Sequence, residues 1–261
     1  MIAGMCGIVR EVGELLLEWR DSEIFEGKWE GAQFKAKVDR MAHNALTERL
    51  HELSPEIPVI SEEDASPFTS IRPGCYWLID PIDGTASFVN GYSGFVTQVV
   101  LMKNDRPEFA AIYAPLLGEM YSAEKGSGSF LNDARLKVDS GKKPAILIDN
   151  YPEPRGVAAS LYNELNFSRY VECGSISLKI CKVADGTADL FFKSVTVRDW
   201  DIAAPQLILE EAGGFLKECD GSMVRYDGSF EHDGIVAAAS DEACAGAVSW
   251  YDNFKKRETI R

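Results

Sequence analysis

The sequence is poor in the residues that bind soft metals and cross-link secreted proteins. It has three histidines and six cysteines among 261 residues, and no two cysteines form a CxxC pair. Without a cluster of histidine and cysteine, a zinc site is not predicted. We therefore expect reduced, mostly buried cysteines in a cytoplasmic protein, because a free cysteine packs as a small hydrophobe.

Basic residues and long apolar runs are also scarce. Lysine and arginine total 27 against 41 acids, which gives a net charge of -14 and argues against a protein that binds nucleic acid through a basic face. No apolar run reaches the roughly 18 residues that a membrane span needs. Residues 1–19 lack the basic and apolar segments of a signal peptide. If the ligand is an anion, a cation must stand between it and this acidic chain.

The first half of the chain has helices followed by many short strands. The full length of 261 residues suits one large domain or two closely packed subdomains. Short connections between the strands indicate a largely antiparallel sheet. Hydrophobic periodicity predicts helices in 1–20 and 38–53, a loop or hairpin at 25–34, and strands at 57–61, 75–80, 94–102 and between 108 and 133.

From about residue 145 strands and helices alternate, which is typical of a layered α/β unit. We therefore predict an N-terminal subdomain over residues 1–140 and a C-terminal one over 141–261, packed as one unit. The predicted elements of this half are strands at 145–150, 188–192 and 235–240, and helices at 175–186, 199–214 and 241–256.

Acidic side chains gather where predicted strands stop and helices start. In WLIDPIDGTASF, residues 77–88, Asp80 and Asp83 flank a proline directly after an apolar run. Glu62 and Glu63 follow the strand at 57–61, and Asp201 lies in the first turn of a helix. Such positions are where open α/β folds place ligand chemistry. Asp39, in the helix at 38–53, is a further candidate.

Carboxylates brought together without histidine or thiolate form a site for Mg²⁺, Mn²⁺ or Ca²⁺. Left unneutralised, they would repel each other and raise each other's pKa. A divalent metal resolves this repulsion and supplies the missing cation. Gly84 and Thr85 then open a short helix whose free N–H groups can bind phosphate. The pattern predicts metal-assisted hydrolysis of a phosphoester, with two or more ions.

Each of these acids also has a simpler interpretation. A single aspartate after a strand is usually a turn former or an N-cap. Asp201 alone can be a favourable charge at a helix N-terminus. The order D-x-x-D-G differs from the D-x-D-x-D-G of an EF-hand, so a calcium loop of that kind is not predicted.

Several motifs together resemble the inositol monophosphatase superfamily. They are DPIDGT at 80–85, the paired glutamates at a strand end, and WDIAAPQLILEEAGG at 200–214. That superfamily contains inositol monophosphatases, fructose-1,6-bisphosphatases and 3'(2'),5'-bisphosphate nucleotidases, and the likeness covers nearly the whole chain. It implies an α/β fold of five layers, α-β-α-β-α, with the metals at the seam between two sheets. It also implies a homodimer.

The resemblance implies ligands for two or three Mg²⁺ ions, for which Mn²⁺ would substitute. These ligands are Glu62, Asp80, the Ile82 carbonyl, Asp83 and Asp201. Asp83 and Asp201 would also contact the substrate. Inhibition by Li⁺ is implied as well, because a small monovalent ion competes at a carboxylate site.

The resemblance also implies how water and phosphate are held. Glu62 and Thr85 would orient the attacking water, with Asp39 supporting Thr85. The backbone amides of Gly84 and Thr85 would hold the phosphate. A metal-activated hydroxide would attack phosphorus in line, without a covalent phosphoenzyme.

The chain departs from the family pattern at two N-terminal positions. Ala36 stands where the family usually has the threonine of a T-x-x-D motif, so the support of Asp39 differs. Lys28 falls where many members carry a lysine in a mobile loop, although a solvated lysine is the alternative. Glu63 is interpreted as a neighbouring or exposed acid instead of a ligand.

The substrate signals conflict. Ser194 stands where inositol monophosphatases have a glutamate that hydrogen-bonds the inositol ring. Segments such as SLKICKVADG resemble bacterial bisphosphate nucleotidases, which makes Lys179 and Arg198 candidates to bind a second phosphate. The ASF after DGT instead resembles the TNF of inositol monophosphatases.

We predict 3'-phosphoadenosine 5'-phosphate as substrate, with inositol monophosphate as the alternative and fructose 1,6-bisphosphate behind it. A different class is a metal- and phosphate-binding regulator without turnover. Such a binder would have no need of Thr85, which orients water. No nucleic-acid polymer or membrane is expected as a partner.

Overall fold

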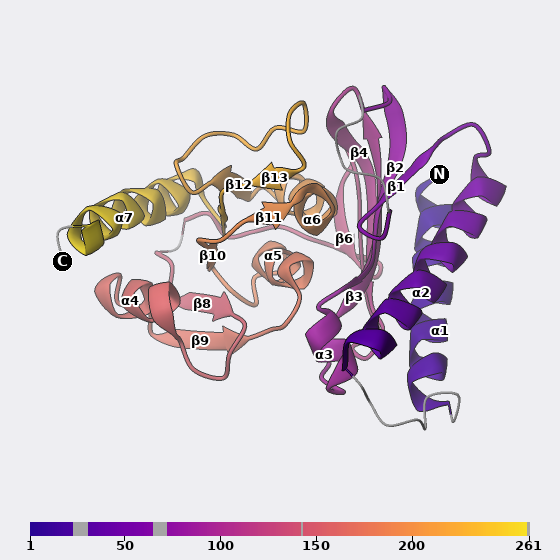
Figure 1. The fold of residues 1–261 in the computed structure, drawn as a ribbon. Coiled ribbons are helices and arrows are strands. Elements are labelled where there is room, and N and C mark those ends of the chain that lie inside the picture. Colours follow the sequence, from indigo (N-terminus) through magenta and orange to yellow (C-terminus); the bar gives the residue numbers. More distant parts are fainter. Residues whose placement is uncertain (23–30, 65–71, 142, 260–261) are drawn as a thin grey trace.

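The protein is described here by a computed structural model, which covers residues 1–22, 31–64, 72–141 and 143–259 (Figure 1). The side chains of residues 31–36 lie outside this description. The helices are α1 (Ile2–Asp21), α2 (Gly31–Leu53), α3 (Thr85–Val89), α4 (Gly156–Glu164), α5 (Ile176–Ala184), α6 (Asp199–Glu211) and α7 (Asp241–Thr259).

The first sheet has seven strands in sequence order, β1 to β7. Strand β1 runs parallel to β2, and every later neighbour is antiparallel, so the predicted largely antiparallel sheet is confirmed. Its strands are β1 (Val59–Ser61), β2 (Cys75–Asp83), β3 (Val96–Lys103), β4 (Arg106–Ala114), β5 (Glu119–Glu124), β6 (Gly128–Leu131) and β7 (Ala134–Arg135).

The second sheet is mixed and has the order β12-β14-β10-β8-β9. Strands β9, β8 and β10 are parallel, whereas β14 is antiparallel to both of its neighbours. A short ribbon of β11 and β13 lies apart from it. The strands are β8 (Ile146–Asp149), β9 (Arg169–Glu172), β10 (Leu190–Lys193), β11 (Val197–Arg198), β12 (Phe215–Glu218), β13 (Glu231–His232) and β14 (Ile235–Ala238).

The elements form five layers, as predicted. In Figure 1 they follow one another from right to left: α1 with α2, the first sheet, α5 with α6, the second sheet, and α4 with α7. The first sheet is built from residues 59–135 and the second from 146–238. The pair α5 and α6 packs against both sheets, so the division of the chain near residue 140 stays a prediction.

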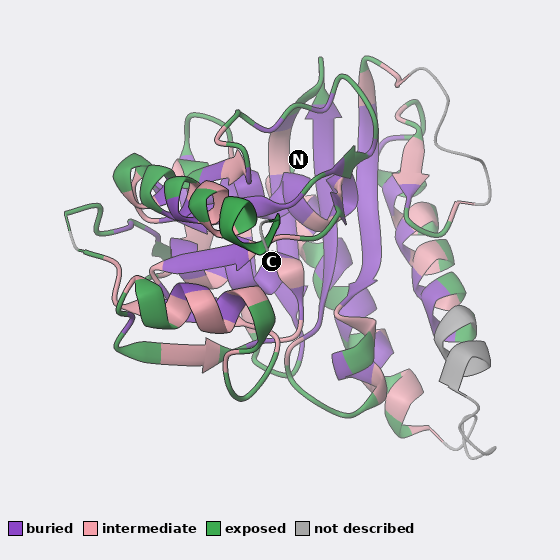
Figure 2. Ribbon diagram, turned by 60° about the vertical axis from the view of Figure 1, so that its left-hand side comes forward, coloured by how far each residue is buried: buried purple, intermediate pink, exposed green. Residues whose placement is uncertain are grey.

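The central strands of both sheets are buried on both faces and appear as purple strands in Figure 2, whereas edge strands such as β9 are half-buried or exposed. In β2, Tyr76 and Leu78 point to the core between the sheets, and Trp77 and Ile79 point to the core under α1 and α2. A strand covered on both sides has no polar face, so it reads as an uninterrupted apolar run. This explains why strand 75–80 was recognisable by its run of apolar residues.

The structure corrects the sequence-based elements in several places. Residues 31–34, predicted as loop or hairpin, belong to α2, whereas 25–30 and Lys28 lie outside the described residues. Helix α4 and strand β9 were not predicted at all. The two glycines of this segment, Gly27 and Gly31, suggested a turn, but helices tolerate glycine at about 1 kcal/mol when packing compensates. None of the helices in the described part of the chain is long and apolar enough to cross a membrane.

Candidate functional site

Strand β2 carries a bulge between its two aspartates. Asp80 pairs with Gln98 of β3, and Asp83 pairs with Val96, so β2 has one residue more than its partner in this interval. Pro81 lies inside it, where its missing N–H costs no ladder hydrogen bond. The Asp80 carboxylate accepts a hydrogen bond from the Ile82 amide at 3.0 Å. The bulge therefore explains why a proline separates the two acids.

The turn after β2 depends on Gly84. Its φ is +86°, a left-handed conformation that side-chain-bearing residues rarely adopt. A Cβ at this position would lie 2.6 Å from the Gly94 carbonyl oxygen and 3.2 Å from the Ser175 Cα. Helix α3 begins at the next residue, where the Thr85 hydroxyl donates to the Ile82 carbonyl at 3.0 Å. This hydrogen bond ties Thr85 to the bulge.

Asp83 is clamped by the first turn of α5. One carboxylate oxygen accepts from the Ser175 hydroxyl at 2.5 Å and from the Ser177 amide at 2.7 Å. The other accepts from the Ile176 amide at 3.3 Å. The first amides of a helix lack partners within the helix and carry partial positive charge, so they favour a carboxylate. The buried side chain of Asp83 is thereby fixed in one orientation.

Asp201 is presented by the first turn of α6. Its carboxylate accepts from the Arg198 amide at 2.7 Å. Gln98 on β3 donates to the Trp200 carbonyl and to the Ser177 hydroxyl, both at 2.7 Å, and Ser177 donates to the Asp201 carbonyl at 2.8 Å. The N-termini of α5 and α6 are thus tied to the first sheet.

Asp80, Asp83 and Asp201 meet in one cluster. One carboxylate oxygen from each lies within 4.8 Å of the other two. Burial, followed by the charges of Glu62, Asp83 and Asp201, raises the pKa of Asp80 well above its usual range. Burial and the Asp83 charge raise the pKa of Asp201 to about 8. Three hard oxygen donors in mutual repulsion fit a divalent cation such as Mg²⁺.

These pKa shifts predict how stability changes with pH and Mg²⁺. The folded pKa of Asp201, about 8, lies above its ordinary value of 3.8, so the folded protein holds this proton more tightly than the unfolded chain does. The resulting contribution to folding stability is complete below pH 4 and is lost as pH rises through 8. Mg²⁺ binds the deprotonated cluster. We expect a Tm increase of about 5–10 °C at 100 times Kd and pH 8. The increase should be much smaller at pH 5.

Thermal unfolding in EDTA and in MgCl₂ at both pH values checks this prediction. Asp201→Asn is the matched control, because it should lose most of the Mg²⁺-induced shift at pH 8. An equal Tm increase at pH 5 and pH 8 would contradict the assignment of the cluster to a metal.

Three other predicted residues, Glu62, Asp39 and Ser194, lie outside the three-aspartate cluster. Glu62 is exposed after β1, and its charge raises the pKa of both Asp80 and Asp201. Asp39 is buried on α2, a helix that contacts α3. Ser194 is half-buried just after β10. The roles of these three residues stay predictions.

Lys179 and Arg198 do not enter the cluster. The Lys179 side chain is fully buried, with its ammonium directed at oxygens of the protein. The Arg198 guanidinium lies at the surface and pairs with Glu231 at 2.9 Å. The Arg198 backbone amide, in contrast, donates to the Asp201 carboxylate. Binding of a second phosphate by either side chain stays a prediction, and this placement does not favour it.

Sequence reasoning missed the residues that orient the acids: Gln98, Ser175 and Ser177. Ser175 could have been identified from the sequence, since a serine before an apolar helix is a typical N-cap. In the structure its hydroxyl accepts a hydrogen bond from the Leu178 amide at 2.9 Å. No sequence feature indicated the role of Gln98, because a single polar residue in an apolar strand does not show which groups it will contact.

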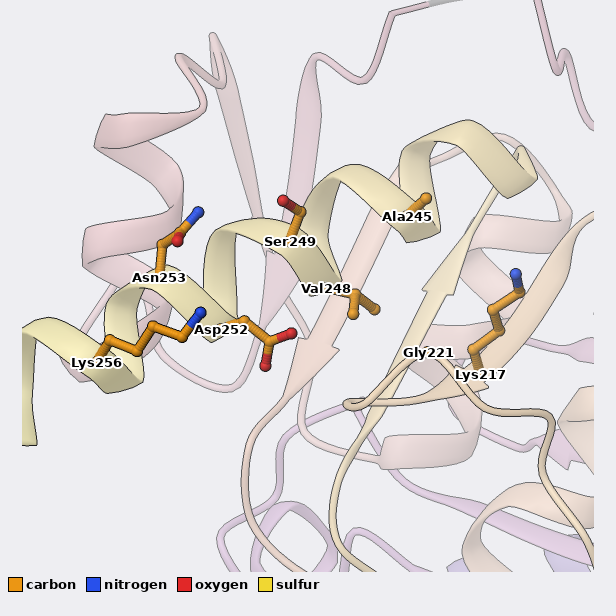
Figure 3. Close-up of a pocket in the computed structure, with 8 residues that line it drawn as sticks. All are labelled: Lys217, Gly221, Ala245, Val248, Ser249, Asp252, Asn253 and Lys256. Atoms are coloured by element: carbon orange, nitrogen blue, oxygen red, sulfur yellow. The ribbon is translucent and has the colours of Figure 1, made fainter.

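The largest of the described hollows, of about 1210 Å³, begins at Gly84 and runs between the first sheet and the loops after β8 and β9. Tyr92, Tyr151, Leu116 and Leu117 are exposed on its walls. A smaller cavity of about 360 Å³ lies elsewhere, between α7 and the segment around Gly221 (Figure 3). None of the predicted site residues lines that second cavity.

Comparisons with known proteins agree with this geometry. The profile of the inositol monophosphatase family matches residues 1–251. The 3'(2'),5'-bisphosphate nucleotidase CysQ of Aggregatibacter actinomycetemcomitans is 32% identical over 200 residues, 73% of this chain and 74% of that protein. Nus factor SuhB of Pasteurella multocida is 30% identical over 196 residues, 72% and 73% of the two chains.

Among solved structures, inositol monophosphatase II of Staphylococcus aureus has a similar fold. The TM-score is 0.78 with 22% identity, over 94% of this chain and 93% of that one. Since the family profile spans nearly the whole sequence and the carboxylates have the donors of a hard-metal site, this chain belongs to the inositol monophosphatase family of metal-dependent phosphomonoesterases.

Proposed function

We propose that this protein is a Mg²⁺-dependent phosphatase whose substrate is a bisphosphate nucleotide of the 3'-phosphoadenosine 5'-phosphate type. The observation that carries this choice is Ser194, which leaves no carboxylate where inositol monophosphatases bind the inositol ring. The relatives named 3'(2'),5'-bisphosphate nucleotidase CysQ support it, at 28–32% identity in three bacteria. Arg198 and Lys179 are not needed for this choice.

The carboxylates of the cluster would bind the metal that activates water. Asp80, Asp83 and Asp201 would hold the metal, together with Glu62 and the Ile82 carbonyl. Bound Mg²⁺ supplies a Lewis acid and lowers the pKa of water. Because the carboxylates are already held by amides and hydroxyls of the protein, they need no reorganisation when substrate binds.

Thr85 and the start of α3 would position the reacting groups. The Thr85 hydroxyl donates a hydrogen bond to the Ile82 carbonyl. The lone pairs of the Thr85 oxygen therefore stay free to accept a hydrogen bond from a water molecule. Asp39 would support Thr85 from α2. The amides of Gly84 and Thr85 would bind phosphate oxygens, as free amides at helix starts do.

The hollow next to Gly84 suits a large leaving group. Its volume of about 1210 Å³ exceeds the roughly 300–1,000 Å³ of most small-molecule sites. Tyr92 and Tyr151 offer ring surfaces to a nucleobase. Among the described residues that line this hollow, Lys182 is the one cation, and it pairs with Glu119 at 2.8 Å. A second phosphate would have to compete for it.

Two alternatives each have an observation in their favour. Inositol monophosphate is favoured by the sequence Ala86-Ser87-Phe88 after DGT, which resembles that of inositol monophosphatases. A binding role, in place of turnover or beside it, is favoured by the relatives named Nus factor SuhB. The predicted homodimer is kept as an expectation under each of these functions.

The substrate proposal is tested by phosphate release with Mg²⁺. We expect 3'-phosphoadenosine 5'-phosphate to be hydrolysed in preference to inositol 1-phosphate and fructose 1,6-bisphosphate. Ser194→Glu should raise the ratio of kcat/KM for inositol 1-phosphate to that for the nucleotide by roughly 10–100-fold, the effect of one hydrogen bond to a charged group.

Ser194→Gln is the matched control, since it has nearly the same shape without the charge. It should shift the ratio less than Ser194→Glu does. Preference of the unmodified protein for inositol 1-phosphate would overturn the choice of nucleotide. If none of the three esters is hydrolysed, the binding role gains support.

A further inference from the structure

Lys179 is a buried lysine whose ammonium donates its hydrogen bonds to oxygens of the protein. It lies on α5 and its side chain has no exposed surface. Its Nζ donates to the Cys173 carbonyl at 3.0 Å, to the Gly174 carbonyl at 3.1 Å and to the side-chain oxygen of Asn150. An ammonium has three N–H donors. These three acceptors account for all of them.

The two carbonyls belong to the turn that joins β9 to α5. This turn packs against the loop before β3: a Cβ at Gly174 would lie 2.8 Å from the Gly94 carbonyl oxygen, and 1.9 Å from the Ser87 hydroxyl. The backbone here therefore cannot shift toward α3. The Lys179 ammonium donates to two carbonyls of the same backbone. The turn is therefore held both by close packing and by hydrogen bonds.

The residues directly after the turn are those that clamp Asp83. Ser175 donates through its hydroxyl at 2.5 Å, and Ser177 through its amide at 2.7 Å. Both distances depend on where the chain enters α5. A displaced turn would move both donors away from the carboxylate. Lys179 is thus linked to Asp83 through the Cys173–Gly174 turn and the first turn of α5.

Burial of this amine is costly unless its hydrogen bonds are kept. Burial lowers the pKa of Lys179 to about 8, against the raising effects of Cys173, Asp83 and Asp149. A buried charge is retained where its partners are well placed. The Lys179 ammonium also lies 5.2 Å from the centre of the Phe191 ring. This side chain is held too deeply to serve as a contact for an incoming phosphate.

We propose that Lys179 is a positioning residue for metal binding: it holds the Cys173–Gly174 turn so that Ser175 and Ser177 keep Asp83 oriented toward Asp80 and Asp201. The inference rests on the proposed metal-dependent function of that cluster. It replaces the interpretation of Lys179 as a ligand of a second phosphate.

The test is Mn²⁺ binding to the metal-free protein, without substrate, followed by the electron paramagnetic resonance of free Mn²⁺. In Lys179→Met the Kd for Mn²⁺ should rise roughly 10–100-fold, as for other groups that orient metal ligands. The KM for the phosphate ester at saturating Mg²⁺ should change less than twofold. Lys217→Met is the control, since Lys217 forms an ion pair with Asp241 away from the cluster and should leave the Kd unchanged.

Measurements at 20 °C, with near-ultraviolet circular dichroism of each variant, separate orientation from unfolding. If Lys179→Met does not fold, Asn150→Ala removes one acceptor and should weaken Mn²⁺ binding less, in the same direction. An unchanged Kd in the folded variant, or a raised KM with an unchanged Kd, overturns the proposal. Unmodified protein that binds no Mn²⁺ overturns the metal site itself, and this is seen before any variant is compared.

Discussion

Asp83→Asn should reduce kcat/KM for the phosphate ester by about a thousandfold or more. Asp83 is one of three carboxylates whose oxygens lie within 4.8 Å of one another, and asparagine replaces its charged oxygen with a neutral, weaker metal donor. A loss of about 4 kcal/mol of transition-state stabilisation corresponds to a thousandfold change. Phosphate release with Mg²⁺, together with Mn²⁺ binding to the variant, measures both consequences.

The same substitution should have a modest effect on folding. The new amide group would face the Ser177 amide or the Ser175 hydroxyl, which now donate to a carboxylate. Mismatched donors cost about 1–3 kcal/mol, and relief of repulsion within the cluster offsets part of it. Glu63→Gln is the control, because Glu63 is exposed beside Glu62 and should keep its activity. Activity within tenfold of the unmodified protein in Asp83→Asn would refute the metal assignment.

Asp199→Asn should lower the free energy of unfolding by about 3–5 kcal/mol, the usual cost of removing one partner from a buried ion pair. Asp199 has no exposed surface and forms an ion pair with Arg72, and it accepts from His232 at 2.8 Å. The other ring nitrogen of His232 bonds to Glu218 at 2.6 Å. The variant leaves two buried cationic groups without their shared carboxylate. Urea denaturation at pH 6.5 measures the loss.

The pH dependence of this loss in unfolding free energy shows how much of it comes from the interaction of Asp199 with protonated His232. Burial alone would lower the pKa of His232, but Asp199 and Glu218 outweigh it and raise the pKa to about 9. Because the folded pKa exceeds the ordinary 6.5, this stabilisation is complete below pH 6.5 and lost as pH rises through 9. The difference between the two proteins should therefore shrink by pH 9.5.

Glu231→Gln is the matched comparison for a surface pair. Glu231 bonds to Arg198 with both side chains well exposed, and such pairs contribute about 0–1 kcal/mol. A loss below 1 kcal/mol in Asp199→Asn, equal to that in Glu231→Gln, would show that the buried network does not stabilise the fold.

Much of the architecture could be predicted because the central strands of both sheets are buried on both sides. These strands appear as apolar runs, helices α1 and α7 keep an apolar period, and α6 is buried nearly all round. Helix α4 and strand β9 were not predicted because the segment from Tyr151 to Glu172 is mostly half-buried or exposed and its elements are short. Where only part of a face packs, the periodic signal is weak.

In the candidate site, too, features that are local in the sequence could be predicted and those that depend on packing could not. Asp80, Asp83 and Gly84 are close in the chain, so the chemistry of a hard-metal and phosphate site could be predicted from local order alone. Asp201 was predicted from its own motif at a helix start. Its approach to Asp83 depends on α5 and α6 entering between the two sheets.

The sequence by itself determined an antiparallel sheet followed by an α/β unit, and the acidic chemistry, because apolar periodicity and closely spaced acids are local properties. The five-layer arrangement was implied by the resemblance of its motifs to a known family. Only the tertiary structure decided how the acids are held. Ser175, Ser177 and Gln98 act on them through hydrogen bonds between segments far apart in the chain. The sequence made Lys179 a candidate to bind a second phosphate, yet the packing of α5 against the second sheet buries its ammonium among backbone carbonyls. A residue pattern does not encode such partners, since burial and direction arise when the layers meet.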